Sequence, residues 1–94
     1  KSGLIGLTQA LAAEYGPQGL RFNAILPGAV DTPMYRAMND SEASQAFITQ
    51  LHALKRIASS DELARAVLYL ASDDSSFVTG TAMLVDGGAS ITRT

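Results

Sequence analysis

Two short apolar runs, each bounded by turn residues, limit the folds open to this chain. The first covers residues 22–26 and ends at Pro27 and Gly28, and the second is Ala82–Val85, which ends at residues 86–88. Such runs are typical of strands buried on both faces of a parallel sheet. A long segment with helical patterning separates them, as a parallel connection requires. We therefore expect a parallel pair with a right-handed crossover.

Apolar spacing predicts three helical segments around these strands. Residues 2–15 carry leucines at helical spacing, and the Gly-Pro-Gln-Gly sequence at 16–19 ends that pattern. Residues 34–55 have a less regular helical pattern. The clearest helix start is at residues 59–62, where Ser59 can cap the helix and Glu62 follows three residues later. The order helix, strand, helical insertion, helix, strand indicates an α/β fold.

Composition excludes several classes of protein. The 94 residues are 47% hydrophobic with a formal net charge of -2, which is globular and gives no basic surface for nucleic acid. No apolar run reaches the roughly 20 residues of a membrane helix, and no signal peptide is expected at the start. The absence of cysteine excludes disulfides and thiolate metal sites. We expect one small domain, in the cytoplasm and away from membranes and nucleic acids.

Three stretches of the chain together resemble the C-terminal part of the short-chain dehydrogenase/reductase family. They are residues 1–8 (KSGLIGLT), residues 19–34 (GLRFNAILPGAVDTPM) and residues 56–88, which close on GTAMLVDGG. Their order and spacing match the family's active-site helix, nicotinamide loop, and last helix and strand. The resemblance implies that residues 1–94 form the C-terminal segment of one Rossmann-type domain, a doubly wound parallel sheet. The two parallel strands and flanking helices would belong to that sheet.

The sequence also departs from the family pattern. The family's glycine-rich phosphate turn, its cofactor selector, and its catalytic serine and tyrosine lie upstream of the matching region and have no counterpart here. Phe22 stands where the family usually carries valine. Because the proton donor is missing, the resemblance implies that the 94 residues alone are inactive.

Lys1 is the candidate catalytic residue. In the family a lysine follows the catalytic tyrosine by four residues, which places both on one helix face. Its positive charge would lower the pKa of the tyrosine, and the resemblance implies hydrogen bonds from the ammonium to the nicotinamide ribose. The alternative is a solvated lysine without a catalytic role.

The segment after the first strand is the candidate cofactor loop. Loops at the carboxyl ends of parallel strands are where open α/β sheets bind ligands. The resemblance implies that Pro27 packs near the nicotinamide of NAD or NADP and that Gly28 allows a close approach. It also implies that the Val30 main chain and the Thr32 hydroxyl bind the carboxamide. The alternative is a Pro-Gly turn followed by a threonine cap.

The remaining polar residues favour structural roles. Asn23 is expected to form structural hydrogen bonds in its strand, and residues 86–88 to form a turn. His52 is the one histidine, so a metal site is not expected, and we place it on a helix surface. Asp61 and Glu62 suit capping better than catalysis.

The resemblance implies that the helical insertion covers the substrate pocket, and its mixture of apolar and amide side chains suits a lid over an uncharged carbonyl or alcohol. The residues concerned are Met34, Tyr35, Met38, Phe47 and Leu51. An ordinary packing helix explains the pattern equally well.

Two hypotheses of function follow. The first is an NAD(P)-dependent oxidoreductase that acts on a carbonyl or alcohol substrate as a homo-oligomer, a dimer or tetramer. The second is a non-catalytic structural or oligomerisation module of the same fold, because the first helix and last strand resemble the family's subunit-contact elements. In either case we expect residues 22–26 and Ala82–Val85 to be parallel neighbours. The helix at 2–15 should then have an uncovered apolar side.

Overall fold

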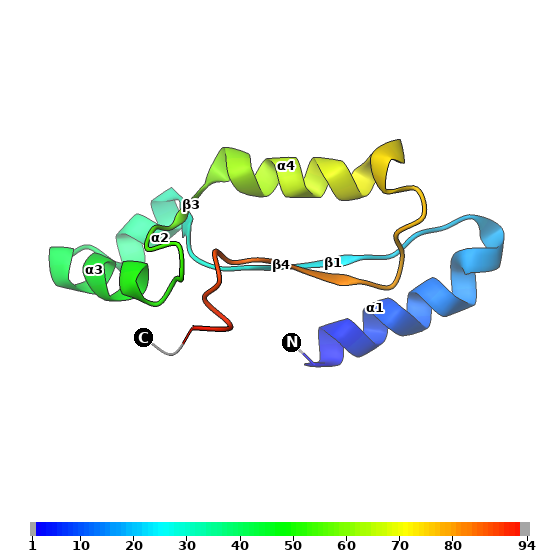
Figure 1. The fold of residues 1–94 in the computed structure, drawn as a ribbon, viewed down its shortest axis with the longest axis horizontal. Coiled ribbons are helices and arrows are strands. Elements are labelled where there is room, and N and C mark those ends of the chain that lie inside the picture. Colours follow the sequence, from blue (N-terminus) through cyan, green and yellow to red (C-terminus); the bar gives the residue numbers. More distant parts are fainter. Residues whose placement is uncertain (1, 93–94) are drawn as a thin grey trace. The chain divides into compact units, whose positions relative to one another are not determined.

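The computed structural model describes residues 2–92 and shows α-helices and short strands in alternation (Figure 1). The elements are α1 (Ser2–Tyr15), η1 (Gly16–Gln18), β1 (Ala24–Pro27), β2 (Val30–Asp31), α2 (Pro33–Met38), α3 (Glu42–Gln50), β3 (Ala58–Ser59), α4 (Ser60–Ala71), η2 (Asp73–Ser75) and β4 (Ala82–Val85), where η marks a 3₁₀ turn. The chain divides into two compact units. Of the described residues, 2–26 and 66–84 form the first, and 27–65 and 85–92 form the second.

In the first unit β1 and β4 are hydrogen-bonded neighbours. The Gly80 N–H donates to the Phe22 carbonyl at 2.7 Å, and the Ala24 N–H donates to the Thr81 carbonyl at 2.9 Å. Residue numbers rise together along both segments, so the pair is parallel, as predicted. The flanking helices α1 and the end of α4 lie on opposite faces of this pair (Figure 1).

Strand β1 begins at Ala24, two residues later than the apolar run predicts. Before that point side-chain hydrogen bonds add to the backbone contact between Gly80 and Phe22. The Phe22 N–H donates to the Thr79 hydroxyl, and the Asn23 amide donates to the Val78 carbonyl and accepts from the Thr81 N–H at 3.1 Å. The predicted structural role of Asn23 is therefore confirmed.

The Arg21 guanidinium joins the start of this region to the end of α4. It donates to the carbonyls of Leu70 and Val78, both at 3.0 Å, and to the Ser72 carbonyl at 3.3 Å. Carbonyls at a helix C-terminus lack intrahelical donors, and a cation there is favourable. Arg21 thus links three segments of the first unit.

Helix α1 ends where the sequence predicts, and Gly19 follows in the left-handed region at a φ of 82°. Thr8 and Ala12 are buried on one face, whereas Leu4 and Leu7 are 47% and 56% exposed. The predicted uncovered apolar side of α1 is confirmed.

In the second unit the start of α4 has the predicted capping box. The Glu62 N–H donates to the Ser59 hydroxyl at 3.1 Å, and the Ser59 N–H donates to the Glu62 carboxylate at 2.9 Å. The Arg56 guanidinium donates two hydrogen bonds to the same carboxylate. These bonds, led by those from Arg56, lower the pKa of Glu62 to about 2.

Two expectations for the second unit were wrong. The helical pattern at 34–55 forms two helices, because the Ser41 hydroxyl caps a new helix, α3, by accepting from the Ser44 N–H. The candidate cofactor loop is not irregular throughout, since it contains β2, which pairs with β3 in parallel. The register places Val30 opposite Ala58.

The described chain buries few apolar side chains. Those that are buried are Ala12, Ala24 and Leu26. Large apolar side chains that stay at least half exposed include Val67, Leu68, Phe77 and Leu84. Within residues 2–92, no helix has the length and apolarity needed to cross a membrane.

Candidate functional site

The candidate site is the segment from Gly28 to Thr32, which leaves the carboxyl end of β1. Pro27, the last residue of β1, is exposed. The Gly28 N–H donates to the Val85 carbonyl at 3.1 Å and so continues the β1–β4 ladder by one residue. This position, beyond the end of a parallel strand, is where ligands bind in open α/β sheets.

Ala29 is held on both sides of its backbone. Its N–H donates to His52 Nε2 at 3.1 Å, and its carbonyl accepts from the Ala58 N–H at 3.0 Å. These partners lie 23 and 29 residues further along the chain. The conformation of the segment is therefore set by tertiary contacts.

The main chain of Val30 points to the other side of β2. The Ala29 carbonyl and the Val30 N–H belong to one trans peptide group, so they point in opposite directions. Because the carbonyl faces β3, the Val30 N–H faces away from it. The alternation of a parallel ladder directs the Val30 carbonyl to the same side as its N–H.

Glycine at position 28 is required by close packing. A Cβ built there would lie 2.8 Å from His52 Nε2 and 3.0 Å from the Cα and carbonyl oxygen of Asp86. The space that a side chain would need is thus filled by the protein itself. Close packing is therefore one reason for glycine at position 28. The close approach of a nicotinamide, which the resemblance implies, is a second one.

Thr32 caps α2. Its hydroxyl oxygen accepts from the Tyr35 N–H at 3.1 Å, which is the capping role considered as the alternative to cofactor contact. A hydroxyl that accepts one hydrogen bond keeps its own proton for donation. Both roles are therefore compatible at this residue. Lys1, the candidate catalytic residue, lies outside the described residues.

The expectation that His52 lies on a helix surface was wrong. The residue follows the end of α3 and is only 4% exposed. Nδ1 of its ring lies 2.9 Å from the Ile48 carbonyl, one helical turn back, and Nε2 accepts from Ala29. No sequence signal reveals the second contact, because a lone histidine after a helix has no pattern of its own. Among the described residues, no group of three His, Cys, Asp or Glu could hold a metal.

The turn at residues 86–88 lies against this site. As predicted, Asp86 bonds to its own backbone, accepting from the Gly88 N–H at 3.0 Å, while Gly87 and Gly88 have positive φ. The Leu54 N–H donates to the Gly87 carbonyl. Hydrogen bonding from Ser90 is the main cause that lowers the pKa of Asp86. The turn thereby positions the Asp86 backbone that packs on Gly28.

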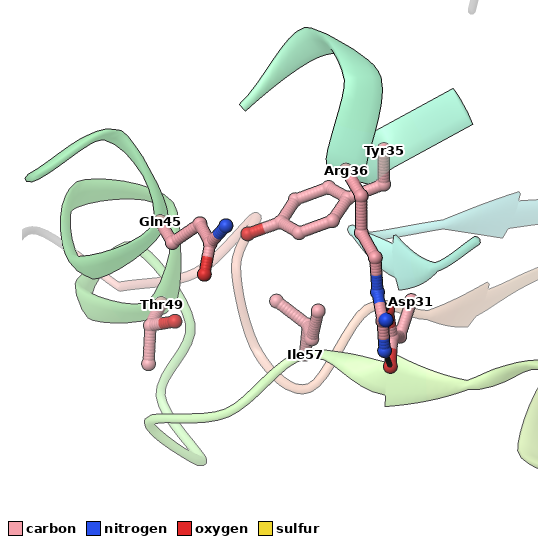
Figure 2. A pocket seen from close by; sticks show the side chains of 6 residues that line it. All are labelled: Asp31, Tyr35, Arg36, Gln45, Thr49 and Ile57. Atoms are coloured by element: carbon pink, nitrogen blue, oxygen red, sulfur yellow. Dashed lines mark hydrogen bonds and ion pairs between the residues drawn. The ribbon is translucent and has the colours of Figure 1, made fainter. Parts of the chain in front are cut away.

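A pocket of about 300 Å³ lies beside the loop in the second unit (Figure 2). Its lining residues are Asp31, Tyr35, Arg36, Gln45, Thr49 and Ile57. Arg36 donates two hydrogen bonds to Asp31, at 2.7 and 2.8 Å, and lowers the pKa of that carboxyl. Gln45 and Thr49 lie on the opposite side of the pocket from this ion pair, and the Tyr35 ring lies between them with its hydroxyl toward Gln45 (Figure 2). The pocket wall is thus mostly polar.

The predicted lid residues divide into two groups. Tyr35 lines the pocket, and Leu51 is half-buried. Met34, Met38 and Phe47 are 72%, 75% and 64% exposed. These three side chains are therefore available to cover a ligand or to meet another part of a protein.

Comparisons with known proteins show the family and the fold of the chain. Residues 1–90 match the family model described as enoyl-(acyl carrier protein) reductase. The chain is 43% identical over 89 residues to 2,5-dichloro-2,5-cyclohexadiene-1,4-diol dehydrogenase of Sphingobium indicum, covering 94% of this chain and 36% of the relative. It is 44% identical over 96 residues to dehydrogenase/reductase SDR family member 6 of Rattus norvegicus, covering 97% and 39%.

Solved structures give the same result. A short-chain dehydrogenase family protein from Francisella tularensis matches with a TM-score of 0.91 and 32% identity over 98% of this chain and 42% of that one. A 4-hydroxyisoleucine dehydrogenase complexed with NADH matches with a TM-score of 0.90 and 30% identity, over 98% and 38%. The fold is thus a Rossmann-type α/β fold, and the chain belongs to the short-chain dehydrogenase/reductase family. It spans less than two fifths of the length of the curated relatives named above.

Gly28→Ala tests the packing of the loop. The added methyl group would force His52 or the Asp86 backbone to move, so we expect a loss of about 1–3 kcal/mol in the free energy of unfolding. Gly16→Ala is the control, because nothing lies within 4 Å of a Cβ built there. Urea unfolding of the complete protein measures both variants. Equal stability of the two variants would contradict the close packing.

Proposed function

We propose that the chain is the C-terminal part of an NAD- or NADP-dependent dehydrogenase or reductase that interconverts a carbonyl compound and an alcohol. The observation that carries this proposal is the fixed main chain after β1, in which the Val30 N–H and carbonyl face away from β3. Two solved neighbours, both 4-hydroxyisoleucine dehydrogenases, are complexed with NADH, which supports a nicotinamide cofactor.

The main-chain groups of Val30 that face away from β3 suit a carboxamide. A carboxamide has an oxygen that accepts and an NH₂ group that donates, so one residue can bind both with its N–H and its carbonyl. Val30 supplies this pair, and the Thr32 hydroxyl adds one donor. Pro27, exposed at the end of β1, offers an apolar surface to a flat ring. We assign these residues to the orientation of the nicotinamide.

Lys1 is assigned to proton transfer and ribose binding. Its ammonium would stabilise the tyrosinate form of a tyrosine on the preceding helical turn, and so lower the pKa of that tyrosine. The same ammonium can donate hydrogen bonds to ribose hydroxyls. Bound NAD or NADP supplies the redox chemistry of hydride transfer. The protein's own residues hold the cofactor and move the proton.

The substrate is a small molecule that carries a hydroxyl or carbonyl group. The named relatives include a cyclohexadiene-diol dehydrogenase, which supports an alcohol as the reduced form. In this chain the polar pocket beside β2 and the exposed apolar residues of α2 and α3 would form one side of the substrate region. We propose that the complete enzyme is a homo-oligomer, which would cover apolar surface such as that of Leu4 and Leu7.

One observation favours a second candidate, a non-catalytic structural or oligomerisation module. Leu68 and Phe77 are 66% and 102% exposed, and an apolar surface of this kind calls for a covering partner. A module whose purpose is association would present such surfaces without a catalytic tyrosine. The two candidates differ in whether sequence upstream of Lys1 completes a cofactor site.

Lys1→Ala in the complete protein tests the catalytic assignment. Without the ammonium, the pKa of the tyrosine rises, so kcat should fall by about 10²-fold and the alkaline pH dependence of kcat should move upward. Steady-state kinetics between pH 6 and about 10 with NADH and NADPH measure both effects. Unchanged rate and pH profile would show that Lys1 is not catalytic.

Assays of the 94-residue chain and of the complete protein together discriminate between the two candidates. We expect a preparation verified at 9.8 kDa to show no NADH- or NADPH-dependent reduction of carbonyl compounds, because it contains neither phosphate turn nor proton donor. Loss of a general acid alone costs about 10²–10⁴-fold. Turnover by that preparation would show that the reaction needs neither the phosphate turn nor the upstream proton donor, and would refute their assigned roles. Inactivity of the complete protein as well would favour the structural module.

A further inference from the structure

His52 is the one buried ring in the second unit whose two nitrogens both contact main chain. Nε2 accepts from the Ala29 N–H at 3.1 Å, and Nδ1 lies 2.9 Å from the Ile48 carbonyl. The residue is 4% exposed, so these contacts are shielded from water. Neither contact belongs to the roles assigned above to Lys1, Val30 or Thr32.

The two partners determine which nitrogen carries the proton. A backbone N–H can only donate and a carbonyl can only accept. Nε2 must therefore be unprotonated to face Ala29, and Nδ1 must carry the hydrogen that it donates to Ile48. The geometry thus requires a neutral ring in the Nδ1–H form. In the opposite tautomer the Nε2–H would face the Ala29 N–H, and the Nδ1 lone pair would face the Ile48 carbonyl.

The ring also lies against the turn at Gly28. A Cβ at that position would lie 2.8 Å from Nε2, so the ring fixes both the position and the orientation of the peptide group between Gly28 and Ala29. The next peptide group, between Ala29 and Val30, carries the N–H assigned to the cofactor. Only the Cα of Ala29 therefore separates the peptide group held by His52 from the peptide group that would bind nicotinamide.

We propose that His52, as a neutral Nδ1–H imidazole, is a positioning residue that joins the end of α3 to the nicotinamide loop. This inference rests on the proposed function of that loop. Through His52, the segment expected to cover the substrate and the segment expected to bind the cofactor share one rigid contact. Without the acceptor at Nε2, the Ala29 N–H would be buried with no partner, and the loop would move to satisfy it.

The test compares His52→Phe with His52→Gln in the complete protein. Phenylalanine keeps a flat ring but has no acceptor, whereas the glutamine oxygen can accept from Ala29. We expect His52→Phe to weaken NADH or NADPH binding and raise the KM for the cofactor by roughly tenfold, with a smaller change in kcat. His52→Gln should keep most of the wild-type cofactor affinity. Gln50→Ala, an exposed change at the last residue of α3, is the control and should bind as the wild type does.

Outcomes for the inference and for the proposed function can be separated. If the wild type binds either dinucleotide and His52→Phe binds it equally well, His52 has no positioning role and the proposed function stands. If the wild type binds neither dinucleotide, the proposed function fails and the inference fails with it. A uniform loss in both variants, without rescue by glutamine, would indicate a structural role only and would also overturn the inference.

A measurement on the wild type covers the case in which His52→Phe does not fold. Nitrogen NMR of the histidine ring reports which nitrogen is protonated. We expect a protonated Nδ1, an unprotonated Nε2, and slow hydrogen exchange of the Ala29 amide. A protonated Nε2 would overturn the inference whatever the variants do.

Discussion

The hydrogen bond from the Ala58 N–H to the Ala29 carbonyl sets the orientation on which the candidate site depends. At 3.0 Å it aligns the Ala29–Val30 peptide group, and the trans geometry of that group sends the Val30 N–H to the opposite side. β3 ends directly before the start of α4. The capping box of Ser59 and Glu62 fixes that start. A helix cap and the candidate cofactor loop are thus parts of one arrangement.

The site is assembled from segments that are distant in the sequence. The Val85 carbonyl, the His52 ring and the Ala58 N–H each hold one group of the segment from Gly28 to Ala29. Each contact closes a long loop and costs conformational entropy, which the complete fold must offset. The gain is a candidate binding segment whose main chain is held in place by the protein itself, as the proposed orientation of a reactive ring requires.

Local signals in the sequence predicted the elements that depend on neighbouring residues. The end of α1 at Tyr15, the strand Ala82–Val85 and the cap at Ser59 follow from glycine, apolar patterning and side-chain capping, all within a few residues. The pairing of β2 with β3 could not be predicted, because two-residue strands have no periodicity. The burial of His52 could not be predicted from the sequence either, since it follows from contacts with Ala29 and Gly28, more than 20 residues away.

The central claim is that the main chain of Val30 binds the nicotinamide end of a dinucleotide. Amide NMR of the complete, isotope-labelled protein tests it most directly, by titration with NAD, NADP and, as a control without nicotinamide, AMP. The account predicts that NAD or NADP shifts the Val30 amide resonance and slows its hydrogen exchange, whereas AMP leaves it unchanged. A dinucleotide that binds without changing the Val30 amide, or an equal change with AMP, would contradict the account.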